Sequence, residues 1–226
     1  MRILAIETSG TAGSVATLDA GRLLAQLELD PAERSTRTLA PAIAQALERT
    51  AWKPTDVQLV AVARGPGSFT SLRLGVMTAK AFAYAVGAKI LGIGTLDAIA
   101  ARAPLEAREL AVAVDAQRGE LYGGSFVRST EGMIAISPVE IVADERWLST
   151  LRPGMTVSGP ALTKLAHRVH DVASVAPSEL WFPDAGAVGL LAAARHALGA
   201  VDDVWTLSPF YVRRSAAEEK WESRTV

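Results

Sequence analysis

The sequence contains no cysteine, so disulfide bonds, thiolate nucleophiles and cysteine-ligated metal sites are all excluded. It also lacks an apolar run that could span a bilayer without interruption by glycine or charged residues. The first residues lead directly into a predicted strand and show none of the features of a secretory signal. We therefore expect a cytoplasmic protein that does not contact membranes.

Histidine is scarce, and the three present are His167, His170 and His196. His167 and His170 are three residues apart on a predicted helix, so they could supply two metal ligands. A solvated helix face is the simpler interpretation of this pair. No G-x-S-x-G motif is present either. The sequence therefore predicts no metal and no bound cofactor, and it lacks the ligands that a metal-dependent peptidase would need.

Charge is nearly balanced, with 23 basic and 24 acidic residues and a formal net charge of −1. Because these residues are dispersed and no basic face is evident, strong binding of RNA or DNA by this chain alone is not expected. The chain has 226 residues, of which 50% are hydrophobic. This indicates a globular protein with one large domain or two small ones.

The stretch Gly65-Pro66-Gly67-Ser68-Phe69-Thr70 is the most distinctive feature of the chain. It follows residues 57–63, which are almost wholly apolar and predict a buried parallel strand. Gly65 and Gly67 permit a sharp turn, after which Ser68 or Thr70 is expected to cap a helix over about 71–86.

That predicted helix carries little charge. At 100° per residue, a narrow stripe of Arg73, Met77, Lys80 and Tyr84 leaves about three quarters of the circumference apolar or small. A surface helix needs only one apolar face. Either this helix lies at the centre of a large domain, or another chain covers one of its sides.

The remainder of the first half predicts strands over 2–8, 15–18 and 22–29, followed by a helix over 35–49. In that helix Leu39, Ile43 and Leu47 form one apolar stripe. Pro41 is tolerated only near a helix start, so we expect the helix to begin late or to bend.

A similar pattern restarts after 103–106. Residues 110–115 form a predicted strand that ends in an acid, Asp115, as the strand over 3–7 ends in Glu7. A turn and a returning strand follow each of them. We therefore predict a duplicated α/β fold with domains over 1–103 and 104–226, the tail of the second packing back on the first.

The acid-bearing turns suggest a nucleotide cleft that has lost its function. The residues expected to line it are Glu7, Thr8, Ser9, Gly65, Gly67, Ser68 and Asp115. Pro160, in Ser158-Gly159-Pro160, removes an N–H where a second phosphate turn would need one. An intact ATP-binding kinase or transferase remains the alternative, and Glu7 and Asp115 could also simply terminate their strands.

Four stretches carry a resemblance to a known family, and they cover nearly the whole chain. They are Ile3-Leu4-Ala5-Ile6-Glu7-Thr8-Ser9 with Ser14-Val15-Ala16, Gly65 to Gly75, Val114-Asp115-Ala116-Gln117-Arg118-Gly119-Glu120-Leu121-Tyr122, and Pro209-Phe210-Tyr211-Val212-Arg213. Together they closely resemble the TsaB (YeaZ) family of bacteria. The resemblance implies the duplicated actin/Hsp70/sugar-kinase-like α/β fold.

It also implies a non-catalytic role. TsaB-like proteins pair with a catalytic paralog, TsaD, and with a small ATPase, TsaE, in transferring a threonylcarbamoyl group to adenosine 37 of tRNA. The chain would then contact tRNA only through the complex, and could form a homodimer in isolation. An M22-like peptidase is the remaining alternative. The two helices of the first half would form the partner interface, through Leu39, Ile43, Leu47, Leu72, Arg73, Val76, Met77, Lys80 and Ala83.

Overall fold

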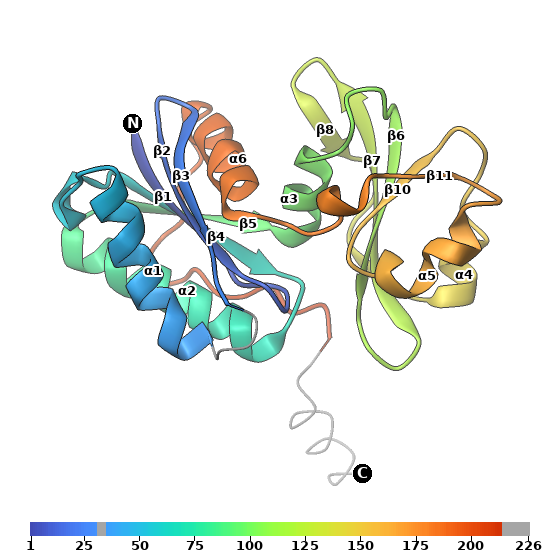
Figure 1. The fold of residues 1–226 in the computed structure, drawn as a ribbon, viewed down its shortest axis with the longest axis horizontal. Helices are drawn as coiled ribbons and strands as arrows, with labels where there is room; N and C mark the ends of the chain where they lie inside the picture. Colours follow the sequence, from blue (N-terminus) through green and yellow to red (C-terminus); the bar gives the residue numbers. More distant parts are fainter. Residues whose placement is uncertain (31–34, 214–226) are drawn as a thin grey trace, which may run out of the picture.

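The computed structural model of the chain describes residues 1–30 and 35–213. Two β-sheets stand side by side, each with helices packed against it (Figure 1). From one end of the molecule to the other, the layers are α1 and α2, the first sheet, α6 and α3, the second sheet, and α4 and α5. No helix in the described part of the chain combines the length and apolar character needed to cross a membrane.

The first sheet has the order β3-β2-β1-β4-β5. Strands β1 to β3 form an antiparallel meander, and β4 and β5 continue the sheet parallel to β1. The strands are β1 (Arg2–Glu7), β2 (Ser14–Asp19), β3 (Arg22–Glu28), β4 (Leu59–Gly65) and β5 (Lys89–Gly94). The helices of this half are α1 (Ser35–Arg49), α2 (Phe69–Val86) and α3 (Thr95–Ala101), with a short 3-10 turn, η1 (Pro54–Asp56).

The two faces of the first sheet bury alternate residues of the same strands, as the two-residue period of a strand requires. Leu4 and Ile6 of β1 face a core shared with α1 and α2. Ile3 and Ala5 face a second core, which α6 completes with residues such as Val188. Because both faces are covered, residues 3–6 of β1 and 59–63 of β4 are all apolar.

The second sheet has the order β11-β10-β6-β7-β8, and β9 also pairs with β7. The strands are β6 (Glu109–Asp115), β7 (Glu120–Ser129), β8 (Gly132–Ala135), β9 (Glu140–Ala143), β10 (Thr156–Ser158) and β11 (Ser174–Val175). The helices of this half are α4 (Asp144–Leu148), α5 (Leu162–Val169) and the 3-10 turn η2 (Ser178–Leu180), and the helix that follows them, α6 (Ala185–Ala197), packs on the first sheet. Strands β6 to β8 form a meander, and β10 and β11 run parallel to β6. This is the arrangement of β1 to β5 repeated, so the predicted duplicated α/β fold is confirmed.

Some predicted details are corrected. Helix α2 begins at Phe69, two residues before the expected start, and ends at Val86, where Gly87 caps it with a left-handed backbone. Pro41 lies inside α1, which starts at Ser35 and not late. The short strands β8 and β11 were not predicted, because neither is long enough to show a clear alternation of apolar and polar residues.

Candidate functional site

The polar side chains of the turn after β1 form hydrogen bonds within the chain. Glu7, Thr8 and Ser9 are all buried. One carboxylate oxygen of Glu7 accepts hydrogen bonds from the backbone N–H of Ser9, at 2.6 Å, and from the Ser9 hydroxyl. The Thr8 hydroxyl donates to the carbonyl of Ser71, at 2.9 Å. Both hydroxyls of the predicted phosphate turn are therefore engaged within the chain.

Glu7 is the most perturbed acid of this turn. Burial raises the pKa of its carboxyl group from 4.5 to about 7, although the hydrogen bonds from Ser9 act in the opposite direction. The nearby carboxylates of Asp184 and Glu28 raise the pKa further. Within the described residues, the second carboxylate oxygen of Glu7 has no hydrogen-bond partner. Glu7 is therefore largely uncharged below neutral pH.

The start of α2 packs directly on this turn. The backbone N–H of Ser68 donates to the carbonyl of Ser9, at 2.8 Å. A Cβ atom at Gly67 would overlap the Ser9 carbonyl, and one at Gly75 would overlap the Thr8 hydroxyl. Glycine at these two positions thus permits α2 and the loop before it to pack closely against the turn.

Asp115 lies in the other half, at the end of β6. Its carboxylate pairs with Lys164 of α5, at 2.5 Å, and accepts from the backbone N–H of Gln117. Burial raises the pKa of Asp115, but the bonds from Lys164 and Gln117 outweigh burial and hold it below its usual value. The sequence did not indicate Lys164, because its partner is distant in the chain.

The C-terminal segment bridges the two halves between these turns. The backbone N–H of Phe210 donates to the carbonyl of Arg64 in β4, at 2.6 Å. Arg213 donates to the carbonyl of Ala116, at 2.8 Å, and forms an ion pair with Glu120. The structure therefore brings six of the predicted cleft residues together in the first half, and separates them from Asp115 by a segment of the chain itself.

A separate groove of about 450 Å³ lies between the halves. Its walls come from β3, the end of α3, the β7–β8 hairpin and α6, with Leu23, Met133 and Leu190 as apolar members and Arg102 and Arg128 as cationic ones. Arg102 pairs with Asp184, at 2.8 Å. The groove is not lined by any of the predicted cleft residues, so it is a different feature of the molecule.

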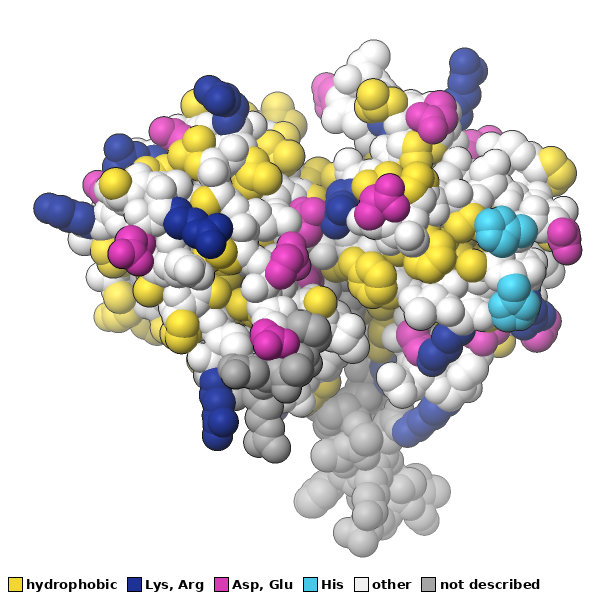
Figure 2. Space-filling view, viewed as in Figure 1, with side chains coloured by type: hydrophobic (Ala, Val, Ile, Leu, Met, Phe, Trp, Pro, Cys, Tyr) yellow, Lys and Arg dark blue, Asp and Glu magenta, His cyan; other side chains and the backbone are white. Residues whose placement is uncertain are grey.

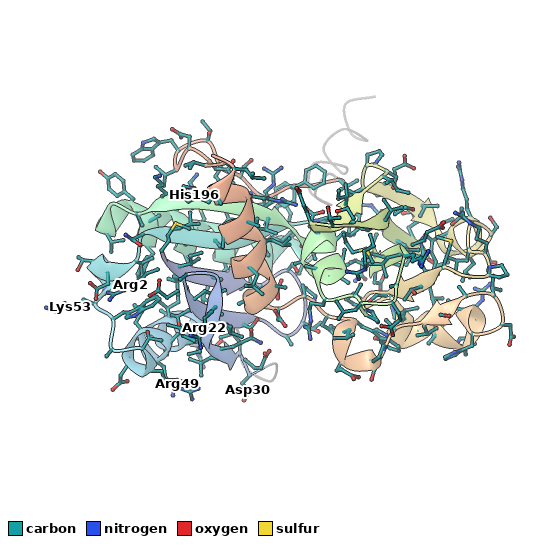
Figure 3. All side chains as sticks on the ribbon, turned by 90° about the horizontal axis from the view of Figure 1, so that it is seen from above. Arg2, Arg22, Asp30, Arg49, Lys53 and His196 are labelled. Atoms are coloured by element: carbon teal, nitrogen blue, oxygen red, sulfur yellow. The ribbon has the colours of Figure 1, made fainter. Side chains whose placement is uncertain are left out.

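The histidines do not converge. His167 and His170 are exposed, and Figure 2 shows histidine side chains on the surface of the second half. His196 lies on α6 in the first half (Figure 3), where its Nδ1 is 3.0 Å from the carbonyl oxygen of Ala200. Over residues 1–30 and 35–213, no three histidine or acidic side chains gather closely enough to hold a metal ion. Lysine and arginine side chains are scattered on the face shown in Figure 2.

Helices α1 and α2 lie together on the outer face of the first sheet (Figure 1). Most of the residues predicted to contact a partner nevertheless point into the chain's own core. Those at most 6% exposed are Leu39, Ile43, Leu47, Leu72, Val76 and Ala83. Burial removes these six from the surface available to a partner. An apolar stripe has the same sequence pattern whether it faces a core or another chain, and here it faces the core.

The exposed side of α2 carries a different set of residues. Met77 is 61% exposed and Tyr84 is 66% exposed, and Arg73 is also exposed. Lys80 is half-buried, because its ammonium group donates to the carbonyls of Trp205 and Leu207, at 3.1 and 2.9 Å. Of the predicted interface, Arg73 and Met77 are accessible, and Lys80 instead fastens the C-terminal segment to the helix.

Comparison with known proteins gives concordant matches. The family model described as TsaD, tRNA N6-adenosine threonylcarbamoyltransferase, matches residues 30–221. A Bacillus subtilis protein named tRNA threonylcarbamoyladenosine biosynthesis protein TsaB is 27% identical over 98% of both chains. The Escherichia coli protein of the same name is 36% identical over 59% of this chain, and the match spans 58% of that relative's length.

A solved structure, YeaZ from Pseudomonas aeruginosa, has the same fold. It superposes with a TM-score of 0.81 at 24% identity, covering 93% of this chain and 99% of the other. The repeated sheet order and the YeaZ superposition identify the fold as the duplicated actin/Hsp70/sugar-kinase-like type. This chain belongs to the TsaD family and, within it, to the TsaB (YeaZ) proteins.

Proposed function

We propose that this chain is a non-catalytic subunit in the biosynthesis of threonylcarbamoyladenosine in tRNA. It pairs with a catalytic TsaD-family paralog through the α1–α2 face, in an assembly that also includes a TsaE-type ATPase. The names of the TsaB relatives and the TsaD-family match support the pathway. Docking stabilises the active conformation of the paralog, because the contacts favour one of its states over another.

The observation that carries the proposal is the pair of large exposed side chains, Met77 and Tyr84, on the outer side of α2. Met77 and Tyr84 are each more than 60% exposed on a helix whose opposite side is fully buried. Large exposed apolar side chains grouped on one element are typical of protein interaction sites. A homologous helix pair on a paralog provides a surface of matching shape.

The geometry of the cleft supports a non-catalytic role. A phosphate turn needs free hydroxyl and N–H donors, but the hydroxyls of Thr8 and Ser9 and the N–H groups of Ser9 and Ser68 are engaged within the chain. Glu7 is buried and its pKa is raised to about 7, so at neutral pH it is only partly in the ionised form that Mg²⁺ requires. Chemistry in the assembly then belongs to the paralog.

Reconstitution tests the proposal. The TsaD-family and TsaE-type proteins of the same genome are purified, and threonylcarbamoyladenosine in tRNA is measured by mass spectrometry with each protein omitted in turn. We expect product only when this chain is present, and a stable complex with the TsaD-family protein on size exclusion. Full activity without this chain, or no complex, contradicts the proposal.

An ATP-dependent kinase or transferase is the second candidate, supported by the fold. Calorimetry with ATP and Mg²⁺ separates the two. Micromolar binding together with turnover by the isolated chain would establish the enzyme, whereas the scaffold role predicts neither. Self-association of the isolated chain, measured by analytical ultracentrifugation, is compatible with the scaffold role because a helix pair can be self-complementary.

A further inference from the structure

The groove of about 450 Å³ between the halves has no part in the proposed function. Helix α6 forms one of its walls, and the β7–β8 hairpin forms another. Figure 1 shows these two elements on either side of α3, which contacts both. The volume is within the usual range for small-molecule sites, which often lie between domains. The groove is therefore large enough for a small organic ligand.

The wall of the groove is largely apolar. Its apolar side chains include Leu23, Met133, Ala187, Leu190, Leu191 and Ala194. Two of them are still nearly half exposed, with 47% for Leu23 and 46% for Leu190. A ligand that covers them removes apolar surface from water, which favours binding. The groove is therefore suited to a ligand with an apolar body.

Arg128, near the end of β7, is a half-buried cation in this wall. Its Nε donates to the carbonyl of Ala107, at 2.8 Å. Its Nη2 donates to the carbonyls of Ala103 and Pro104, at 3.3 and 2.7 Å. A guanidinium has five N–H donors, so these bonds leave the two on Nη1 without a partner in residues 1–30 and 35–213. The same bonds hold the guanidinium in place before a ligand binds.

The other charged groups of the wall do not neutralise Arg128. Arg102 and Asp184 pair with each other, at 2.8 Å. Glu131 is exposed in the turn between β7 and β8, and among the described residues it forms no ion pair with Arg128. The charge of Arg128 is therefore available to an anion beside the apolar wall.

The single charge of Arg128 favours a carboxylate over a phosphate. Guanidinium groups bind carboxylates through paired N–H donors, and Nη1 of Arg128 has two. A phosphate monoester carries about −1.5 to −2 charges at neutral pH. One guanidinium would leave part of that charge without compensation in an apolar groove, which is unfavourable.

We propose that the groove binds a small amphipathic carboxylate. Its carboxylate accepts from Nη1 of Arg128, and its apolar body lies against α6, Leu23 and Met133. Because α6 packs on the first sheet and the β7–β8 hairpin belongs to the second, the ligand contacts both halves. Binding therefore favours the arrangement in which these walls are close together. The site is separate from the α1–α2 face and does not depend on the proposed function.

Octanoate and 1-octanol are suitable probes, because they have the same chain length and differ in the charge of the head group. Binding to the full chain is followed by methyl NMR, with Leu23, Met133 and Leu190 as reporters. We expect saturable shifts of these methyl signals on addition of octanoate. A charged hydrogen bond to Arg128 should make octanoate bind about tenfold more tightly than 1-octanol.

Two variants test the two parts of the site. Arg128→Gln removes the charge, and we expect it to weaken octanoate binding about tenfold while changing 1-octanol binding less than about twofold. Leu190→Glu places a carboxylate in the groove from an exposed position, and we expect it to weaken octanoate binding about tenfold. Its matched control is Leu198→Glu, because Leu198 is 84% exposed after the end of α6 and does not line the groove.

Circular dichroism establishes that each variant is folded, and Leu190→Glu still tests the site if Arg128→Gln does not fold. Octanoate that binds no more tightly than 1-octanol, or that keeps its preference in a folded Arg128→Gln, overturns the role of Arg128. Absence of saturable binding at millimolar octanoate overturns the site. Equal weakening by Leu190→Glu and Leu198→Glu also overturns it, because binding would then not be located in the groove. Reconstitution with the TsaD-family protein is a separate measurement, so failure of this site leaves the proposed function standing.

Discussion

Glu7 is a carboxylic acid placed where water cannot reach it. Its side chain is fully buried, and its only bonded partner in the described residues is Ser9, which satisfies one of the two carboxylate oxygens. Ionisation is therefore opposed by burial and by the carboxylates of Asp184 and Glu28. The folded state is therefore more stable when Glu7 is protonated than when it is ionised.

A dependence of stability on pH follows. Because the pKa of Glu7 is raised from 4.5 to about 7 on folding, the unfolded chain loses this proton first, and stability falls as pH rises from about 4.5 to about 7. A shift of this size corresponds to ~3 kcal/mol at pH 8. We expect Glu7→Gln to remove this loss, so that the free energy of unfolding of the variant increases relative to that of the wild type as pH rises. Urea denaturation at pH 5 to 8 measures the difference.

The control is Glu48→Gln, because Glu48 is exposed on α1. Its difference from wild type should not vary with pH by more than about 0.5 kcal/mol, as is usual for surface substitutions. A constant difference between Glu7→Gln and wild type across the pH range would mean that Glu7 is ionised throughout, and would remove one argument against Mg²⁺ binding.

The position of Glu7 at a strand end was predictable from sequence, but its burial was not. The strand ends because a run of small residues follows, which is local information. The start of α6 packs beside the turn: the N–H of Ala185 donates to the hydroxyl of Ser14, the strand partner of Glu7, at 2.9 Å. That contact joins residues far apart in the chain, and no local pattern reports it.

At the scale of the element, the two sides of α2 differ in how strongly a substitution by a charged residue lowers stability. Val76 is 1% exposed within the core under the first sheet, whereas Met77, the next residue, is 61% exposed. Val76→Glu is expected to lower the free energy of unfolding by more than about 3 kcal/mol, because a carboxylate would be buried without a partner. Met77→Glu is expected to change it by less than about 1 kcal/mol.

Thermal or urea unfolding measures both variants, and pull-down with the TsaD-family protein measures pairing. Met77→Glu should remain folded and pair at least tenfold more weakly. A folded, stable Val76→Glu would show that this side of the helix is not core. Normal pairing by Met77→Glu would move the interface away from α2.

Periodicity predicted the existence of these helices well, and for α1 it predicted the bounds. It could not say which molecule covers each apolar side. Leu39, Ile43 and Leu47 cover the chain's own sheet. The accessible aromatic side chains of the C-terminal segment, such as Trp205, belong to no helix or strand. A segment without periodicity gives no signal of where it packs, so this part of the candidate site required the structure.

At the scale of the whole molecule, the duplication was predictable because each half repeats a strand, an acid and a turn. The path of the chain between the halves was not. Helix α6 returns to the first sheet after the second sheet is complete. Residues 203–213 then run along α2 to the turn between β6 and β7 (Figure 1). Both are long-range contacts, which depend on tertiary packing and not on local pattern.

Arg213 attaches the end of the described C-terminal segment to the second half. It donates to the carbonyl of Ala116 and pairs with Glu120, and its side chain is 19% exposed. These two bonds attach the C-terminal segment to the β6–β7 turn, while Phe210 is bonded to Arg64 in the first half. The C-terminal segment is therefore bonded to both halves.

Arg213→Ala should loosen this connection without unfolding either sheet. We expect faster amide hydrogen exchange in residues 116–120 and 209–212, and a loss of stability on the order of 1 kcal/mol, as for a partly exposed charge-assisted pair. Arg152→Ala is the control, because Arg152 pairs with Glu109, at 2.5 Å, within the second half alone. If exchange in both segments is unchanged while the chain stays folded, Arg213 does not hold the halves together. The bonds that Lys80 and Arg64 make to the C-terminal segment would then be enough to hold it on the first half.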